Sequence, residues 1–189
     1  KYVGIDEINK LENLGVMYFG ENRVQAFLEK YQKYNGNCKF HMIGTLQPNK
    51  VKYIIDKVDL IHSVDSYSLI KEIEKQANKH NLVMKVLIQV NISKEESKHG
   101  FKVEEIEEVF DTLKNYPHIE VKGLMMMAPN IEAEKTREYF KLTQDLFNQL
   151  KIKYPEYSLT ELSMGMSNDY KIALEYGATM VRIGSSLFK

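Results

Sequence analysis

Two short loops near the carboxyl end of the chain combine glycine with hydroxyl side chains. One loop, 163–169, has the sequence Ser-Met-Gly-Met-Ser-Asn-Asp and leads into a predicted helix that begins near Tyr170. The other follows Arg182 and contains Gly184-Ser185-Ser186. Glycine lets the backbone approach an anion closely, serine adds a hydroxyl donor, and a helix N-terminus presents unpaired N–H groups with a favourable dipole. Both loops therefore suit a phosphate group.

Each loop also has a purely structural interpretation. Ser167 and Asp169 are residue types that cap a helix, and Gly184 is typical of a turn. Either loop alone favours that interpretation. Their joint position favours a phosphate ligand, because they follow the last two strands of a predicted barrel, where phosphate groups are often held.

A lysine and an arginine complete the candidate site. We expect Lys1 at the carboxyl end of a strand, with its amine pointing into the same mouth as the two loops. A lysine aldimine beside a phosphate cradle is how pyridoxal phosphate is normally held, with a further residue at the pyridine nitrogen. Arg182 suits that last role, since a protonated guanidinium has only donors and would leave the ring nitrogen unprotonated, making the cofactor a weaker electron sink. The alternatives are a solvated surface lysine and an interior ion pair at Arg182.

The apolar pattern predicts the elements that must position these side chains. Short apolar runs alternate with amphipathic segments of about 10–20 residues, which is typical of βα units around a parallel sheet. The strand candidates are 16–20, 40–44, 60–65, 83–91, 121–129, 159–166 and 180–188. The predicted helical faces are Val24, Phe27, Leu28 and Tyr31; Val51, Ile54, Ile55 and Val58; and Val103, Ile106, Phe110 and Leu113.

The number of units decides between two α/β architectures. The stretch 5–14 has helical spacing and Gly15 as its stop, so we expect a strand before it that ends near Lys1. That strand gives eight βα units, which favours a (β/α)8 TIM barrel over an open doubly wound sheet. Because the sequence starts at Lys1, we expect the first helix and strand in a longer native chain. No linker interrupts 1–189, so we predict a single barrel domain.

The strand at 85–91 tests the barrel prediction, because it has one apolar and one polar face. We expect the apolar face against helices and the polar face in the barrel interior. An edge strand with a wet face is the alternative. The apolar residues are Val86, Ile88 and Val90, and the polar residues are Lys85, Gln89 and Asn91.

Composition narrows the class of partner. Lys plus Arg and Asp plus Glu both number 26, so there is no global field to attract nucleic acid or anionic lipid. No apolar run approaches the roughly 20 residues of a membrane helix. The single cysteine, Cys38, cannot form an internal disulfide, which favours a reducing cytoplasm. Small molecules are therefore the expected partners, without nucleic acid or membrane.

Short motifs occur in a fixed order along the whole chain. They are Phe19-Gly20-Glu21-Asn22, His41-Met42-Ile43-Gly44-Thr45-Leu46-Gln47-Pro48-Asn49-Lys50, Ile61-His62-Ser63-Val64-Asp65-Ser66, Gln89-Val90-Asn91, Gly123-Leu124-Met125-Met126-Met127-Ala128-Pro129, Leu162-Ser163-Met164-Gly165-Met166-Ser167 and Val181-Arg182-Ile183-Gly184. In this combination they resemble the pyridoxal phosphate homeostasis proteins, the YggS/PROSC family. The resemblance extends from the first residue to the last, and the number of ordered motifs makes it specific.

The resemblance implies a fold and a function. The fold is a single-domain, fold-type III barrel similar to the amino-terminal domain of alanine racemase. The function is to bind, buffer and deliver pyridoxal 5′-phosphate within the cell, with apo-enzymes as partners and no established turnover. The positions similar to the family's cofactor-binding residues are Lys1 as the aldimine lysine, Arg182 facing the pyridine nitrogen, Ser167, Gly184 and Ser185 at the phosphate, and Asn22 near the cofactor.

Two enzymatic alternatives stay open at this point. An amino-acid racemase needs proton donors and acceptors on both faces of the cofactor, and no motif nominates a base opposite Lys1. A phosphosugar-metabolising barrel enzyme would need paired carboxylates or a lysine in mid-barrel, for which Asp65 and Lys85 are candidates. The family motifs favour a carrier over both.

The remaining features have structural interpretations. His41 and His62 lie in predicted strands without a cluster of further ligands, so we expect hydrogen-bonding histidines and no metal. We expect Met125-Met126-Met127 to pack the barrel, with a methionine flanking a bound ring as the alternative. The charged loop 94–100 is interpreted as solvated surface or as a rim over the cofactor. No unexplained apolar helix face remains, which favours a monomer.

Overall fold

The computed structural model describes residues 3–93 and 99–187. They form a parallel sheet with the strand order β1-β2-β3-β4-β6-β7-β8, and β5 pairs with β4 off this path. The strands are β1 (Tyr18–Glu21), β2 (Lys39–Met42), β3 (Leu60–Val64), β4 (Met84–Asn91), β5 (Phe101–Lys102), β6 (Ile119–Met126), β7 (Glu161–Met166) and β8 (Met180–Arg182).

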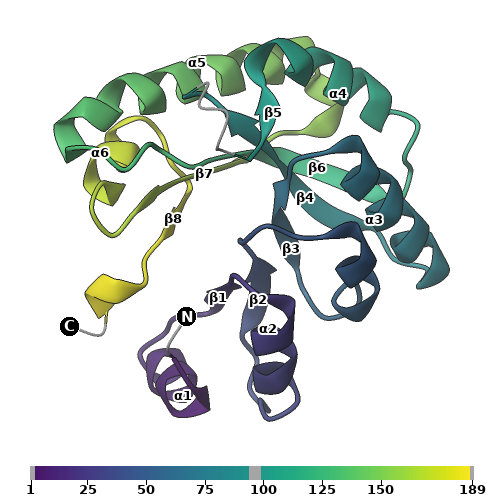
Figure 1. Cartoon of the computed structure of the whole chain (residues 1–189), viewed down its shortest axis with the longest axis vertical. Coiled ribbons are helices and arrows are strands. Elements are labelled where there is room, and N and C mark those ends of the chain that lie inside the picture. The colour runs from purple at the N-terminus through teal and green to yellow at the C-terminus, as the bar shows by residue number, and fades with distance from the viewer. Residues whose placement is uncertain (1–2, 94–98, 188–189) are drawn as a thin grey trace.

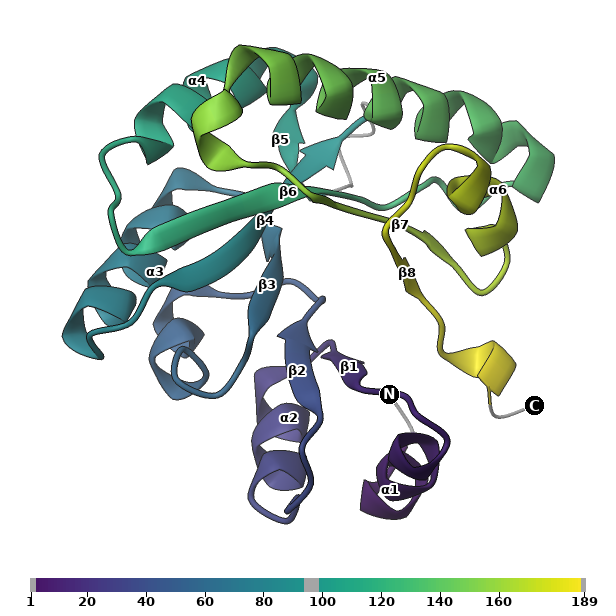
Figure 2. The same ribbon diagram turned by 180° about the vertical axis from the view of Figure 1, so that it is seen from behind.

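The helices connect successive strands and cover one face of the sheet. The sheet curls into an arc with β1 and β8 at its two ends, and the helices lie on the outside of the arc (Figures 1 and 2). The α-helices are α1 (Ile5–Asn13), α2 (Val24–Tyr31), α3 (Tyr67–Lys79), α4 (Ile106–Leu113), α5 (Arg137–Lys153) and α6 (Tyr170–Glu175). The 3-10 helices are η1 (Pro48–Tyr53), η2 (Val103–Glu105), η3 (Ala133–Thr136), η4 (Pro155–Tyr157) and η5 (Ser185–Leu187).

This arrangement confirms the predicted barrel architecture of repeated βα units. The strand predicted to end near Lys1 lies outside the described residues, and within the described ranges β1 and β8 each pair with a single neighbour, β2 and β7. Gly15 follows α1 with a φ of +91°, a left-handed conformation that glycine adopts readily, as its predicted role as a helix stop requires.

The core has two layers separated by the sheet. The large outer layer fills the space between strands and helices, and it includes fully buried Phe27, Ile88 and Phe140. A small inner layer of Leu60, Leu87 and Met125 lies apart from it. Period-two alternation along each strand sends consecutive side chains to opposite faces, so one strand serves both layers.

Strand β4 follows the predicted alternation. Val86 and Ile88 are buried in the outer layer, whereas Lys85 lines a cavity on the inner side of the sheet. Gln89 is 6% exposed, and its Nε2 donates to the carbonyl oxygen of His99 at 3.2 Å. The predicted polar inner face therefore exists, with Leu87 between Lys85 and Gln89.

Three predicted elements need correction. Val51, Ile54 and Ile55 are fully buried, as predicted for one helical face, but the segment is not an α-helix. It forms the 3-10 helix η1, which begins at Pro48, followed by a turn. Strand 180–188 was predicted too long: β8 stops at Arg182, because Gly184 and the serines that follow favour a turn. Strand 121–129 ends at Met126, since Pro129 cannot donate to a sheet.

The strand β5 was absent from the prediction. Its two residues pair with the end of β4, Val90 opposite Phe101 and Asn91 opposite Lys102. Phe101 is buried, and its ring lies edge-on to Tyr67 with the ring centroids 5.3 Å apart. Long-range packing, not a local apolar pattern, places this segment in the sheet.

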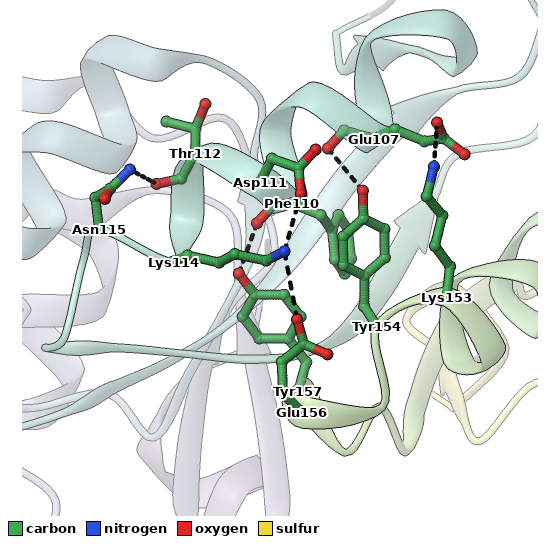
Figure 3. A network of polar contacts seen from close by, with 10 residues as sticks. All are labelled: Glu107, Phe110, Asp111, Thr112, Lys114, Asn115, Lys153, Tyr154, Glu156 and Tyr157. Atoms are coloured by element: carbon green, nitrogen blue, oxygen red, sulfur yellow. Dashed lines mark hydrogen bonds and ion pairs between the residues drawn. The ribbon is translucent and has the colours of Figure 1, made fainter.

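Side-chain hydrogen bonds join the outer helices to one another. Figure 3 shows two tyrosines at the end of α5 and in η4 that reach the backbone of α4. The hydroxyl of Tyr154 donates to the carbonyl oxygen of Glu107 at 3.1 Å, and that of Tyr157 donates to the carbonyl oxygen of Phe110 at 2.6 Å. These contacts fix neighbouring βα units relative to each other. Within the described part of the chain, no helix has the length and apolar character to cross a membrane.

Candidate functional site

A large cavity lies on the inner side of the sheet. Its volume is about 980 Å³, which is at the upper end of the range for sites that hold small molecules and cofactors. The loops after β1, β7 and β8 contribute to its wall, as expected for the carboxyl ends of strands in a barrel. The site residues that line it are Asn22, His41, His62, Ser167, Arg182 and Gly184.

Arg182 is fixed by groups from two neighbouring strands. Its Nη1 donates to Oγ of Ser163 at 2.6 Å, and its Nη2 donates to the carbonyl oxygen of Met126 at 2.8 Å and lies 3.0 Å from Sδ of Met127. Its Nε is buried and has no hydrogen-bond partner within residues 3–93 and 99–187. One N–H donor of an immobilised guanidinium is therefore left over in a residue that lines the cavity.

Arg182 keeps its positive charge at neutral pH although it is partly buried. Burial lowers the pKa of Arg182 to about 10, although the carboxylate of Asp169 opposes this shift. The side chain stays protonated at neutral pH, so its free Nε–H donates and cannot accept. The alternative of an interior ion pair is wrong for the described residues, since none of their carboxylates forms a salt bridge with Arg182.

Two histidines extend the contacts of Arg182 across the inner side of the sheet. Nδ1 of His62 lies 2.9 Å from Oγ of Ser163, and Nε2 of His62 lies 3.0 Å from Nδ1 of His41. The expectation that these histidines form hydrogen bonds is confirmed. Their connection to Arg182 was not predicted, because residues 41, 62, 163 and 182 are far apart in the sequence.

Both histidines are held neutral. Burial, followed by the nearby His41 and Arg182, lowers the pKa of His62 to about 2. Burial also lowers the pKa of His41, against the opposing effects of Asp59 and Glu161. No group of three His, Cys, Asp or Glu side chains is placed to hold a metal ion in the described ranges 3–93 and 99–187.

The loops after β7 and β8 meet as the sequence predicted. The backbone N–H of Gly184 donates to Oγ of Ser167 at 3.4 Å. No heavy atom lies within 4 Å of the position where a Cβ would stand at residue 184, apart from the glycine's own neighbours. Oγ of Ser167 accepts this bond, so its own hydroxyl proton can donate to an oxyanion in the open space beside Gly184.

The β7 loop has its own internal support. Gly165 has a φ of +93°, and a Cβ there would lie 2.6 Å from Cβ of Ala173, so glycine is required. Oδ1 of Asp169 accepts a hydrogen bond from the backbone N–H of Met166 at 2.6 Å. Asp169 makes no side-chain cap of α6, so it shapes the loop, and the simple capping interpretation is wrong for this residue.

Asn22 directly follows β1 and is exposed at the cavity. Gly44 allows the close approach of the loop after β2 to this residue, because a Cβ at residue 44 would lie 2.3 Å from the backbone oxygen of Asn22. Two predicted site residues cannot be placed: Lys1 lies outside the described residues, and so does the side chain of Ser185. The structure therefore brings Asn22, Ser167, Arg182 and Gly184 to one cavity.

Comparisons with known proteins agree with this geometry. The family model described as the alanine racemase N-terminal domain matches residues 1–189. A "Pyridoxal phosphate homeostasis protein" of Aquifex aeolicus is 45% identical over 190 residues, covering 100% of this chain and 83% of the relative. The structure of PipY from Synechococcus elongatus, solved with PLP bound, is similar with a TM-score of 0.92 and 31% identity, covering 100% of this chain and 89% of PipY.

A more distant structure shares the fold alone. The alanine racemase of Clostridium difficile has a TM-score of 0.75 and 18% identity, and the similarity covers 97% of this chain and 48% of the racemase. Because the family model spans the whole chain and the Aquifex relative is so similar, this chain belongs to the alanine racemase N-terminal domain family, among the pyridoxal phosphate homeostasis proteins.

Proposed function

We propose that this protein binds pyridoxal 5′-phosphate at the inner cavity and serves intracellular vitamin B6 homeostasis by holding the cofactor reversibly. The observation that carries the proposal is an unsatisfied donor on Arg182: its Nε is buried without a partner among the described residues, and Arg182 lines the same cavity as Ser167 and Gly184. A buried donor without a partner costs free energy of about 1–3 kcal/mol, which a ligand acceptor would recover.

The donor set fits this cofactor. The pyridine nitrogen is an acceptor and suits the Nε–H of Arg182, while the phosphate suits the hydroxyl of Ser167 and the open space at Gly184. Ser185 adjoins the same loop and is proposed as a further phosphate ligand, with Asn22 near the cofactor. Lys1 is the proposed covalent anchor. When bound, pyridoxal phosphate supplies an aldehyde that reacts reversibly with an amine.

The character of Arg182 favours holding over turnover. A permanently protonated guanidinium does not give a proton to a ring nitrogen, so the ring keeps less ability to accept electrons from a bound amino acid. The Aquifex relative is named for cofactor homeostasis and PipY was solved with PLP bound, which supports the same assignment. We further propose that the protein acts as a cytoplasmic monomer and passes the cofactor to apo-enzymes.

Absorption spectroscopy tests the anchor and the ligand together. The full-length protein is mixed with pyridoxal phosphate, and the spectrum is recorded before and after borohydride reduction, with Lys1→Ala and Lys85→Ala alongside. Lys85 lines the same cavity and serves as the matched lysine control. We expect a long-wavelength band in wild type and Lys85→Ala, and a reduced adduct that mass spectrometry locates at Lys1. A free-aldehyde spectrum in wild type would refute the proposal.

A further inference from the structure

Arg182 is the first member of a hydrogen-bonded chain that crosses three other strands. From β8 the contacts run to Ser163 on β7, then to His62 on β3 and His41 on β2. His62 is 2% exposed and Ser163 is fully buried. Water therefore cannot replace the partners of either residue, and each of their donors and acceptors needs a partner within the protein.

Donor and acceptor roles in this chain follow from Arg182. A guanidinium has only donors, so Oγ of Ser163 accepts at its 2.6 Å contact. The single proton of Ser163 then has one described acceptor within reach, Nδ1 of His62 at 2.9 Å. His62 must accept at Nδ1 and carry its own proton on Nε2, where Nδ1 of His41 lies 3.0 Å away and accepts it.

The opposite direction would leave a polar group unsatisfied. If Nδ1 of His62 donated to Ser163, the serine proton would have no acceptor among the described residues, which costs free energy in a buried site. A doubly protonated His62 is disfavoured as well, because it would place a second buried cation beside Arg182, in keeping with the strongly lowered pKa of His62. Each donor in this series of hydrogen bonds therefore points from Arg182 toward His41.

We infer that Ser163 and His62 are positioning residues that set the orientation of the Arg182 guanidinium toward a bound ring. This inference rests on the proposed function for its ligand, and it goes beyond it by assigning work to two residues on other strands. His62 holds the serine proton, so the serine lone pair points at Nη1 of Arg182. His41 in turn fixes which way the His62 ring faces.

This support matters because Arg182 lacks a carboxylate partner among residues 3–93 and 99–187. The other groups that hold its guanidinium are a backbone carbonyl oxygen and a thioether sulfur, and the sulfur is a weak acceptor. The bond to Ser163 is the short charge-assisted contact between side chains. Its loss would let the guanidinium plane turn and move Nε from its present position.

Nuclear magnetic resonance of the ligand-free, full-length protein tests the direction of the chain. Histidine side chains are labelled with ¹⁵N, and the protonated nitrogen of each ring is identified through couplings to the ring protons. We expect both His62 and His41 as Nε2–H tautomers. An Nδ1–H tautomer at His62 would overturn the inference, and this measurement needs neither a variant nor the cofactor.

A second measurement uses pyridoxal phosphate labelled with ¹⁵N at the ring nitrogen. Ser163→Ala and His62→Leu should shift the signal of the bound ring nitrogen and weaken cofactor binding roughly 3- to 10-fold. His62→Gln should restore both properties, since an amide accepts and donates as the imidazole does. His118→Leu is the matched control, because His118 pairs with Glu74 away from Arg182.

The outcomes separate this inference from the proposed function. If wild type binds the cofactor and the ring-nitrogen signal is unchanged in Ser163→Ala and His62→Leu, the positioning role is refuted and cofactor binding stands. If wild type fails to bind pyridoxal phosphate, the proposed function is refuted, and so is the role of Ser163 and His62 in orienting Arg182 toward a bound ring. The histidine tautomers then report only the direction of the hydrogen bonds.

Discussion

Nη1 of Arg182 lies 2.6 Å from Oγ of Ser163, and the Nε of the same guanidinium is left without a partner in the described ranges 3–93 and 99–187. A guanidinium that is held on one edge and keeps an unsatisfied N–H donor on the other can bind a ligand acceptor. The pair joins β7 to β8, the two strands whose following loops carry Ser167 and Gly184.

Replacing Arg182 by lysine should weaken the binding of pyridoxal phosphate about 10-fold or more. Lysine keeps the positive charge, but it lacks the planar fork that contacts Ser163 and the Met126 carbonyl while leaving Nε free. Equilibrium dialysis measures the dissociation constant, with Lys85→Ala as the control at the same cavity. Equal dissociation constants for wild type and Arg182→Lys would show that a positive charge at residue 182 is enough for binding.

The phosphate loops should distinguish pyridoxal phosphate from pyridoxal. Ser167→Ala removes a hydroxyl donor, and Gly184→Val fills the open space beside it. Each change should reduce affinity for pyridoxal phosphate roughly 3- to 10-fold, the value of one or two hydrogen bonds, and leave the affinity for pyridoxal nearly unchanged. A parallel loss for both ligands would mean that these loops do not contact the phosphate.

Stability should fall in mild acid through His62. Its pKa is about 2 in the folded protein and 6.5 ordinarily, so the unfolded chain binds the extra proton. The stabilisation is complete above pH 6.5 and is lost as the pH falls from 6.5 toward 2, and the lowered pKa of His41 acts in the same direction.

Urea titrations between pH 7 and 5 measure this effect. Below pH 6.5 the free energy of unfolding of wild type should fall more steeply than that of His62→Gln, by up to about 1.4 kcal/mol per pH unit for the one proton removed. Identical slopes in wild type and His62→Gln would contradict a neutral buried His62.

The tyrosine contacts of Figure 3 should contribute to stability and not to the site. Tyr157→Phe removes the hydroxyl that donates to the Phe110 carbonyl and leaves that buried acceptor with one partner fewer. We expect a loss of about 1 kcal/mol in the free energy of unfolding by urea denaturation. The dissociation constant of pyridoxal phosphate should not change, since neither residue lines the cavity.

The order of the βα units was predictable because their signals are local. Apolar alternation placed the strands within a few residues, and the faces of α2 and α4 came from helical spacing. The prediction failed where tertiary packing overrides local pattern. A 3-10 helix replaces an α-helix in η1, Phe101 joins the sheet as β5, and β8 stops at Arg182.

By itself, the sequence determined the parallel α/β architecture, the two glycine-and-serine loops and the chemical capacity of Arg182. Each of these depends on residue type, or on spacing within a few turns or strand positions. The tertiary structure decided which groups meet. His62 contacts a serine 101 residues away, and Ser163 contacts an arginine 19 residues further on, because the curvature and register of the sheet bring their side chains to its inner face. Pairing over such distances has no local signature, so the directional chain from Arg182 to His41 exists only in the folded protein.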